Sequence, residues 1–114
     1  MDVPDDAEIV YTSVSTPGHH VLETLLEEGV PITQLVSITP EMGEAAGVAK
    51  YTDFSPIAEA HDLPIYYPET YSMDEADVEF FETLNADLMI VNGWNRIIPG
   101  EVLDTFDDGV LDVD

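Results

Sequence analysis

The sequence lacks cysteine and has almost no positive charge, and each absence excludes a class of protein. Without cysteine, neither a disulfide framework nor a thiolate metal site is available. The 114 residues carry two basic side chains, Lys50 and Arg96, against 25 acidic ones, which gives a formal net charge of -23. No stretch approaches the roughly 20 apolar residues of a membrane span. Residues 1–6 are acidic, unlike the basic start of a signal peptide, so we expect a cytoplasmic protein.

The acidic excess fits three interpretations: a site for cations or basic partners, a nucleic-acid mimic or interaction surface, and a solvated surface adapted to molar salt. The acidic residues are scattered along the chain rather than gathered in one ligand loop. Molar salt shortens the Debye length to about 3 Å and screens their repulsion, whereas at low salt the same charge opposes the compact state. We favour the salt-adapted, halophilic interpretation.

Apolar residues make up 45% of the chain, a content that disordered acidic tails lack. The length fits one small domain over residues 1–114. β-branched and aromatic runs predict strands, and helical periodicity between them predicts helices. Strands are expected at 8–14, 32–38, 65–67, 88–91 and from 110 onward, and helices at 17–28, 55–62, 73–84 and 99–104. Residues 39–53 are expected to form a long connection, and Ser55 to cap the helix that follows.

Strand, helix and strand alternate from the start of the chain, as in parallel right-handed crossover units. The fold class is therefore α/β: a Rossmann-like, three-layer arrangement with a parallel sheet of about five strands. Ser15 or Thr16 is expected to cap the first helix, and Gly29 to end it in the left-handed conformation. The continuous apolar run at 88–91 is typical of a strand buried on both faces.

Ligands of such sheets bind beyond the carboxyl ends of the strands, where residues 14–20, residues 92–98 and the C-terminus fall. Ser15, Thr16 and His19 stand in a strand-to-helix turn whose N–H groups favour an anion. The turn lacks the glycines of a dinucleotide fingerprint and the lysine of a P-loop. The alternative is a polar helix start that faces solvent. His19 and His20 are adjacent, so we expect their side chains to diverge and to form no joint metal site.

The second segment contains the only tryptophan and the only arginine of the chain. Gly93 permits a sharp turn or the close approach of a ring. Trp94 offers a large apolar surface, and Ile97 and Ile98 are suited to line a slot for a flat heterocycle. Arg96 supplies five fixed hydrogen-bond donors. The alternative is that Arg96 forms a salt bridge with one of the many acidic residues.

The sequence resembles the formyltransferase family, which includes methionyl-tRNA, glycinamide ribonucleotide and sugar N-formyltransferases. The resemblance spans residues 8–114, and its most specific part is 84–103, with the run from Leu84 to Pro99. It also includes the Ser-Thr-Pro-Gly turn that begins at Ser15, the Leu-Glu-x-Leu-Leu helix and the Asp-Leu-Pro-Ile of 62–65. Residues 47–54 are similar to the second-strand connection of methionyl-tRNA formyltransferase-like and sugar-modifying members.

The resemblance implies transfer of a formyl group from 10-formyltetrahydrofolate to an amine. It implies that one segment lines the pteridine pocket, with Gly93, Trp94, Asn95, Arg96, Ile97 and Ile98 as cofactor-binding residues. It places Ser15, Thr16 and His19 on the side of the acceptor substrate. The acceptor itself stays open between tRNA, a sugar nucleotide and another amine.

The family also carries an Asn-x-His on the next strand and an Asp further on. The Asn donates to the formyl oxygen, and the His and Asp manage protons on the amine. In this sequence the Asn and His positions fall at Asp112 and Asp114, and a carboxylate repels a developing oxyanion. In the alternative register, shifted by one residue, the His position falls at 115, beyond this sequence. We therefore expect no catalytic residue here, but an N-terminal portion of a formyltransferase domain that is inactive alone.

The partners expected from the resemblance are a small-molecule donor and an amine acceptor, with the C-terminal half of the domain or a homo-oligomer. Neither a membrane nor direct nucleic-acid binding by this portion is expected. An alternative of a different class is a stand-alone module that binds folate or a nucleotide. A third is an acidic protein-interaction domain, for which charge concentrated on one face would be the sign.

Overall fold

The computed structural model describes residues 8–48, 50–68, 73, 75–94 and 98–113, and the side chains of Glu75, Asp112 and Val113 are not described. All structural statements concern these residues. The elements in chain order are β1 (Ile9–Thr12), α1 (Thr16–Glu27), β2 (Ile32–Val36), α2 (Pro40–Ala46), α3 (Ser55–Ala60), β3 (Ile65–Tyr66), α4 (Glu75–Leu84), β4 (Leu88–Asn92), α5 (Gly100–Leu103) and β5 (Val110–Val113).

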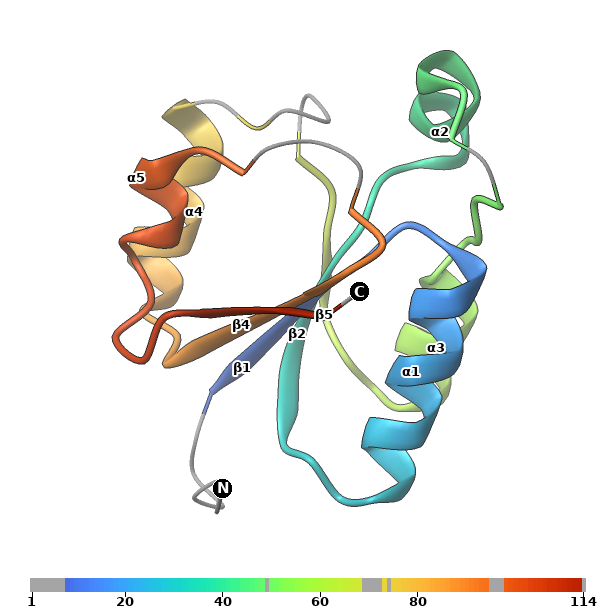
Figure 1. Cartoon of the computed structure of the whole chain (residues 1–114), viewed down its shortest axis with the longest axis horizontal. Coiled ribbons are helices and arrows are strands. Elements are labelled where there is room, and N and C mark those ends of the chain that lie inside the picture. The colour runs from blue at the N-terminus through green and yellow to red at the C-terminus, as the bar shows by residue number, and fades with distance from the viewer. Residues whose placement is uncertain (1–7, 49, 69–72, 74, 95–97, 114) are drawn as a thin grey trace.

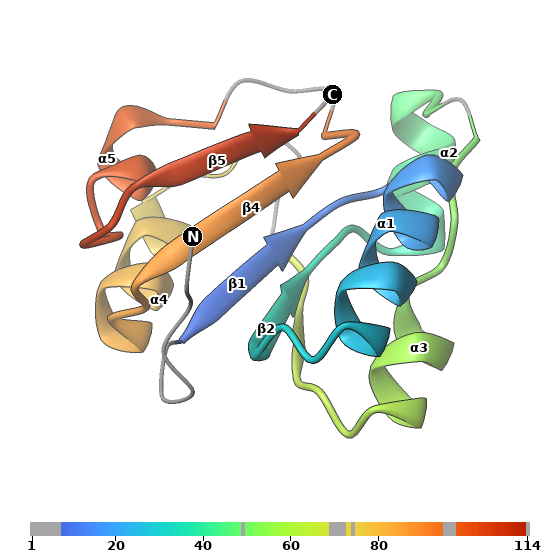
Figure 2. The same cartoon turned by 60° about the horizontal axis from the view of Figure 1, so that its bottom comes forward.

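The strands form one parallel sheet in the order β3-β2-β1-β4-β5. Helices α1 and α3 cover one face, and α4 and α5 cover the other (Figure 1). Figure 2 shows the strands side by side with their arrows pointing the same way. The predicted three-layer α/β fold with about five parallel strands is confirmed, and the carboxyl ends of the strands share one edge.

The central strand β1 contributes side chains to the core on both faces of the sheet, because successive side chains point to opposite faces. Ile9 and Tyr11 pack with Leu22 of α1, whereas Val10 packs with Phe81 of α4. Burial reaches both faces of β4 as well, where Met89 to Asn92 are all buried. The apolar run at 88–91 is thus the twice-covered strand that the sequence predicted.

Helix α1 follows its sequence signals closely. The Ser15 side chain accepts a hydrogen bond from the Gly18 N–H, Pro17 lies in the first turn, and Gly29 adopts a positive φ of 81° just beyond the helix end. Leu22 is fully buried. Val21, Leu25 and Leu26, on the same face of the helix, are partly buried against the core.

The connection at 39–53 was predicted to lack regular structure, and this was wrong because it contains helix α2. Thr39 caps this helix by accepting from the Met42 N–H at 3.2 Å, Pro40 occupies its first turn, and Gly47 ends it in the left-handed conformation with φ 65°. The proline and glycine that suggested a loop are therefore its two ends. Seven residues are too few to show a clear apolar period.

Ser55 was predicted to cap the next helix, and this was also wrong. Phe54 occupies the cap position of α3 in a right-handed helical conformation, without a side-chain hydrogen bond. The carboxylate of Asp53 instead accepts the Ser55 N–H at 2.9 Å. The remaining boundaries differ from the predicted ones by one or two residues, as frayed ends do. None of the described helices is long and apolar enough to cross a bilayer.

Candidate functional site

The two segments that the sequence placed beyond the strand ends are in direct contact. A Cβ on Gly93 would lie 2.2 Å from the Ser15 Oγ, and Gly93 itself adopts a left-handed φ of 71°. A Cβ on Gly18 would lie 1.8 Å from the Ser13 Oγ and 2.9 Å from the carbonyl oxygen of Asn92. The β1–α1 turn and the end of β4 therefore form one wall at the carboxyl edge of the sheet.

Trp94 follows this contact and is half-buried. It packs against the core on the α4 side and against a smaller apolar cluster built on Val14 and Ile38. Ile98, also half-buried, packs on the α4-side core. Asn95, Arg96 and Ile97 lie outside the described residues. The pteridine pocket over residues 93–98 stays a prediction.

Ser15 and Thr16, predicted to face the acceptor, form hydrogen bonds within the turn. Ser15 Oγ caps α1. The N–H and Oγ1 of Thr16 donate to the Lys50 carbonyl oxygen at 2.9 and 3.1 Å, and Thr16 Oγ1 lies 2.6 Å from Thr52 Oγ1. Thr52 N–H in turn donates to the Val14 carbonyl at 3.0 Å. These bonds fix the turn against residues 50–52, and binding of an acceptor by these two residues stays a prediction.

His19 lies beside a carboxylate rather than free in solvent. Its Nδ1 is 3.1 Å from Glu23 Oε1, and its ring is 5.2 Å from the Phe54 ring in an edge arrangement. His20 Nδ1 reaches the same Glu23 oxygen at 3.5 Å. The expected divergence of the two histidines was wrong in this respect, because positions three and four residues apart on a helix are neighbours. Within the described residues, no three His, Cys, Asp or Glu side chains are arranged to hold a metal ion.

Two tyrosines, the buried Tyr11 and the partly buried Tyr51, hold the loops around this edge. Tyr11 donates to the Gly18 carbonyl oxygen at 2.6 Å, and burial raises the pKa of its phenol. Tyr51 donates to the Ile38 carbonyl oxygen at 2.8 Å. Burial, together with the nearby Asp53 carboxylate and smaller contributions from Tyr67 and Glu41, raises the pKa of Tyr51 to about 12. Both phenols therefore stay protonated donors at neutral pH.

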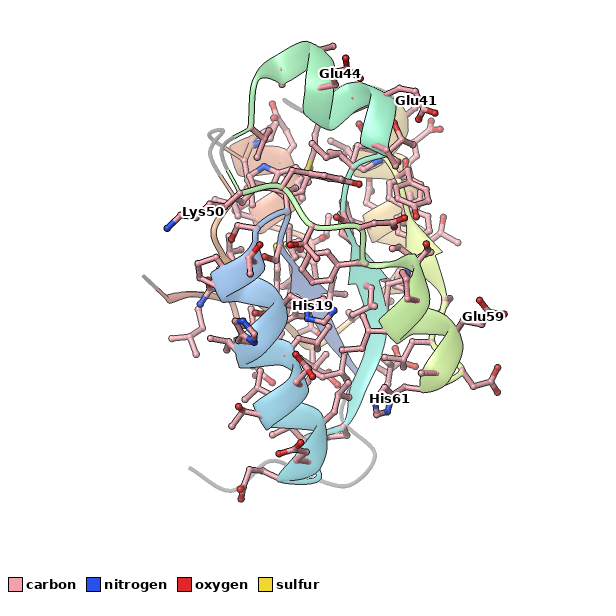
Figure 3. The ribbon with its side chains drawn as sticks, turned by 90° about the vertical axis from the view of Figure 1, so that its right-hand side faces the viewer. His19, Glu41, Glu44, Lys50, Glu59 and His61 are labelled. Carbon is pink, nitrogen blue, oxygen red and sulfur yellow. The ribbon has the colours of Figure 1, made fainter. Side chains whose placement is uncertain are left out.

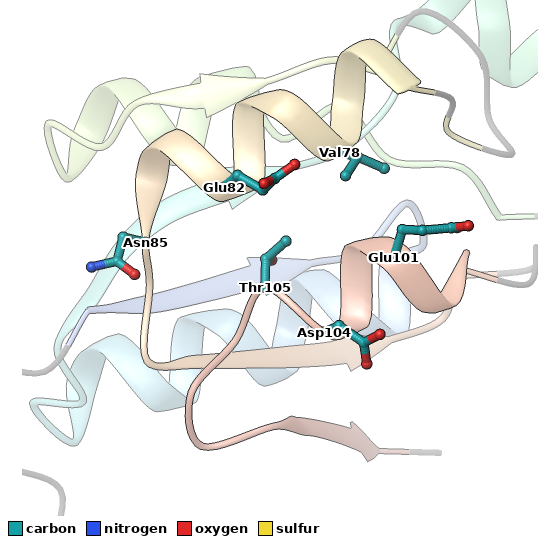
Figure 4. Close-up of a pocket in the computed structure, with 6 residues that line it drawn as sticks. All are labelled: Val78, Glu82, Asn85, Glu101, Asp104 and Thr105. Carbon is teal, nitrogen blue, oxygen red and sulfur yellow. The ribbon is translucent and has the colours of Figure 1, made fainter.

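Two surface hollows lie away from Ser15, Gly93 and Trp94. One, of about 370 Å³, lies between α1 and α3, on the face that Figure 3 presents with His19 and His61. Its lining residues are His19, Glu23, Glu27, Pro56, Ile57, Ala60 and His61. The other, of about 480 Å³, lies between α4 and α5 (Figure 4) and is lined by Val78, Glu82, Asn85, Glu101, Asp104 and Thr105. Carboxylates border both hollows, as expected for so acidic a chain.

Sequence reasoning placed Ser13 and Gly18 in the strand-to-helix turn but gave these two residues of the wall no role of their own. A glycine in the first turn of a helix was the available signal, because glycine there weakens the helix unless another group approaches closely. Of the positions that correspond to the family's Asn and His, the backbone of Asp112 lies in β5 opposite Val91. The Asp112 side chain and all of Asp114 lie outside the described residues.

Comparison with protein families adds an independent finding. The family model described as formyl transferase matches residues 9–113. This match runs from the first residue of β1 to the last residue of β5 and includes both segments at the carboxyl edge. Because it covers nearly the whole chain, the protein belongs to the formyl transferase family.

Proposed function

We propose that this chain binds 10-formyltetrahydrofolate and presents its formyl group to an amine acceptor. Formyl transfer is the activity of the family. The observation that carries the folate donor is the joint wall of the β1–α1 turn and the end of β4, from which residues 93–98 continue. The segment suits a flat heterocycle. Gly93 turns the backbone in the left-handed conformation, and Trp94 and Ile98 keep part of their apolar surface exposed.

In the reaction, the amine nitrogen would bond to the formyl carbon while negative charge develops on the formyl oxygen. The bond from that carbon to N10 of the folate would then break, tetrahydrofolate would leave with a proton on N10, and the amine would lose a proton. In this proposal the chain's own part is orientation. The apolar surfaces of Trp94 and Ile98 hold the ring system, and polar groups of 93–98 fix its direction. Orientation of this kind removes much of the entropic cost of bringing two reactants together.

We also propose that the groups which stabilise the oxyanion and move protons come from outside residues 1–114. The motivating observation is that Asp112 and Asp114 stand where the resemblance implies Asn and His. A carboxylate cannot donate a hydrogen bond to an oxyanion and repels it. A C-terminal half of the domain would supply these groups to an amine acceptor.

The experiment is a calorimetric titration of 5-formyltetrahydrofolate, a stable relative of the donor, into the folded chain in molar KCl. We expect saturable binding that Trp94→Ala and Arg96→Ala abolish. Lys50→Ala is the matched control for Arg96→Ala, because it removes the other basic side chain of the sequence and leaves residues 93–98 unchanged. A folded wild-type chain without saturable binding contradicts the donor site. Binding with no formyl transfer after the C-terminal half is added favours a stand-alone binding module.

A further inference from the structure

Two serine hydroxyls occupy the space between two glycines at the carboxyl edge of the sheet. The Ser15 Oγ lies 2.2 Å from where a Cβ on Gly93 would be and accepts the Gly18 N–H at 3.4 Å. The Ser13 Oγ lies 1.8 Å from the Cβ position of Gly18 and 3.7 Å from that of Gly93. Both serines are buried, Ser13 completely. Each hydroxyl is therefore close to both glycines.

This packing leaves no space for a methyl group at either glycine. At Gly18 a methyl would meet the Asn92 carbonyl oxygen at 2.9 Å, and this backbone atom cannot rotate away. At Gly93 a methyl would meet the Ser15 side chain, and the residue has a positive φ as well. The start of α1 and the end of β4 are thus in contact through backbone and hydroxyl groups.

Gly93 directly precedes Trp94, so the position of Ser15 sets the direction in which the chain leaves β4. The other side of this contact is held by the Tyr11 hydroxyl, which donates to the Gly18 carbonyl oxygen at 2.6 Å. Ser13 is tied in by the Ser15 N–H, which donates to its hydroxyl at 3.4 Å. Displacement of either serine would therefore move the start of residues 93–98.

We propose that Ser13 and Ser15 are positioning residues for the formyl donor. Their hydroxyl groups pack against Gly18 and Gly93 and thereby fix the orientation of Trp94. This inference rests on the proposed function, since it concerns the same donor site. It differs from the prediction that Ser15 faces the acceptor. The serines act through the glycine contacts and do not touch the substrate.

The test is a double-mutant cycle between Gly93→Ala and Ser15→Gly, measured as the dissociation constant for 5-formyltetrahydrofolate in molar KCl. We expect Gly93→Ala to weaken binding by roughly tenfold or more, because small displacements of positioning groups are costly. Adding Ser15→Gly should restore part of the affinity, because it removes the atoms that the new methyl meets. Gly109→Ala is the matched control: Gly109 also has a positive φ, of 90°, but its Cβ would meet nothing within 4 Å. It should bind like the wild type.

A second measurement needs no ligand, so it separates the positioning role of the serines from the proposed folate binding. Trp94 is the only tryptophan of the chain. Its fluorescence emission maximum therefore reports the surroundings of this ring, and no ligand is needed for the measurement. We expect Ser13→Ala and Ser15→Ala to shift this emission and weaken binding at a temperature where both variants are fully folded. If the wild type binds no folate but the serine variants shift the emission, the serines do position Trp94, and only the proposed folate donor is contradicted. Unchanged Trp94 emission in the serine variants overturns the inference. It is also overturned if Gly109→Ala loses as much affinity for 5-formyltetrahydrofolate as Gly93→Ala and if Ser15→Gly restores none of the affinity that Gly93→Ala loses.

Discussion

Tyr11 shows how much one residue contributes at this edge. Its ring lies in the core beneath α1, with 1% of the residue exposed, and its hydroxyl is hydrogen-bonded to Gly18. Burial raises the phenol pKa because the charged form would lose its hydration. The unfolded chain has the ordinary tyrosine pKa of about 10. Tyr11 therefore links the stability of the β1–α1 turn to alkaline pH.

The first prediction concerns Tyr11→Phe. Below pH 10 neither the folded nor the unfolded state ionises at this residue, so its contribution to stability is intact. Above pH 10 the unfolded state loses the proton while the folded state keeps it. The free energy of unfolding then falls with pH, by about 1.4 kcal/mol per unit for one proton. Tyr11→Phe should remove this part of the pH dependence of the free energy of unfolding, measured by denaturant melts between pH 9 and 12. Equal slopes in both proteins would contradict it.

A second prediction at this scale tests the core. Phe81 is fully buried among side chains from β1, β4 and α5. Phe81→Ala should lower the free energy of unfolding by about 3–5 kcal/mol, through lost burial and the cavity left behind. Leu111→Ala is the matched control, because Leu111 is 49% exposed and its truncation should cost far less. Chemical denaturation in molar KCl compares them, and similar losses would mean that the α4 side is not the packed core described.

At the scale of elements, helices with a strong apolar stripe and clear end signals could be predicted from the sequence. The short helix α2 and the contacts between residues far apart in sequence could not. Helices α1 and α4 were predicted from their helical period, and each fully buries a large apolar side chain, Leu22 in α1 and Phe81 in α4. Helix α2 was missed because about two turns show little period. The contacts of Ser13 and Ser15 with Gly93 were missed because they join residues far apart in sequence, which local patterns do not encode.

The third prediction compares two helix starts. Thr39 caps α2 through its hydroxyl, whereas Ser55, despite its favourable type, does not cap α3. Thr39→Ala should therefore lower stability by about 1 kcal/mol, and Ser55→Ala should change it little. Thermal melts of both variants in molar KCl give the answer. Equal effects would show that the two helix starts are not capped as described.

At the scale of the whole molecule, 25 acidic side chains stand against two basic ones. Among the described residues, His19 and His20 are the side chains whose nitrogens lie within ion-pair distance of a carboxylate, that of Glu23 in both cases. Exposed glutamates stand on both α2 and α3, as Figure 3 shows for Glu41, Glu44 and Glu59. Mutual repulsion of these charges opposes the compact state unless salt screens it.

The fourth prediction follows from this charge. The melting temperature should rise between 0.1 and 2 M KCl, by about 4 °C for each kcal/mol of repulsion that is screened. A variant with five exposed carboxylates neutralised should depend less on salt, namely Glu27→Gln, Glu28→Gln, Glu41→Gln, Glu44→Gln and Glu59→Gln. Sucrose is the uncharged control for a general solvent effect. The same salt dependence in the wild type and in the neutralised variant would argue against salt adaptation.

The central place of β1 in the sheet has a consequence for how the chain is made. Its residues pair with β2 on one side and with β4 on the other, where Ile9 lies opposite Leu88. Contacts that span so much sequence slow folding, because a long loop must close before they form. During synthesis, β1 leaves the ribosome early and keeps one unpaired edge until β4 emerges. Such an edge invites pairing with other chains, so the nascent chain depends on rapid completion or on a chaperone until β4 closes the sheet.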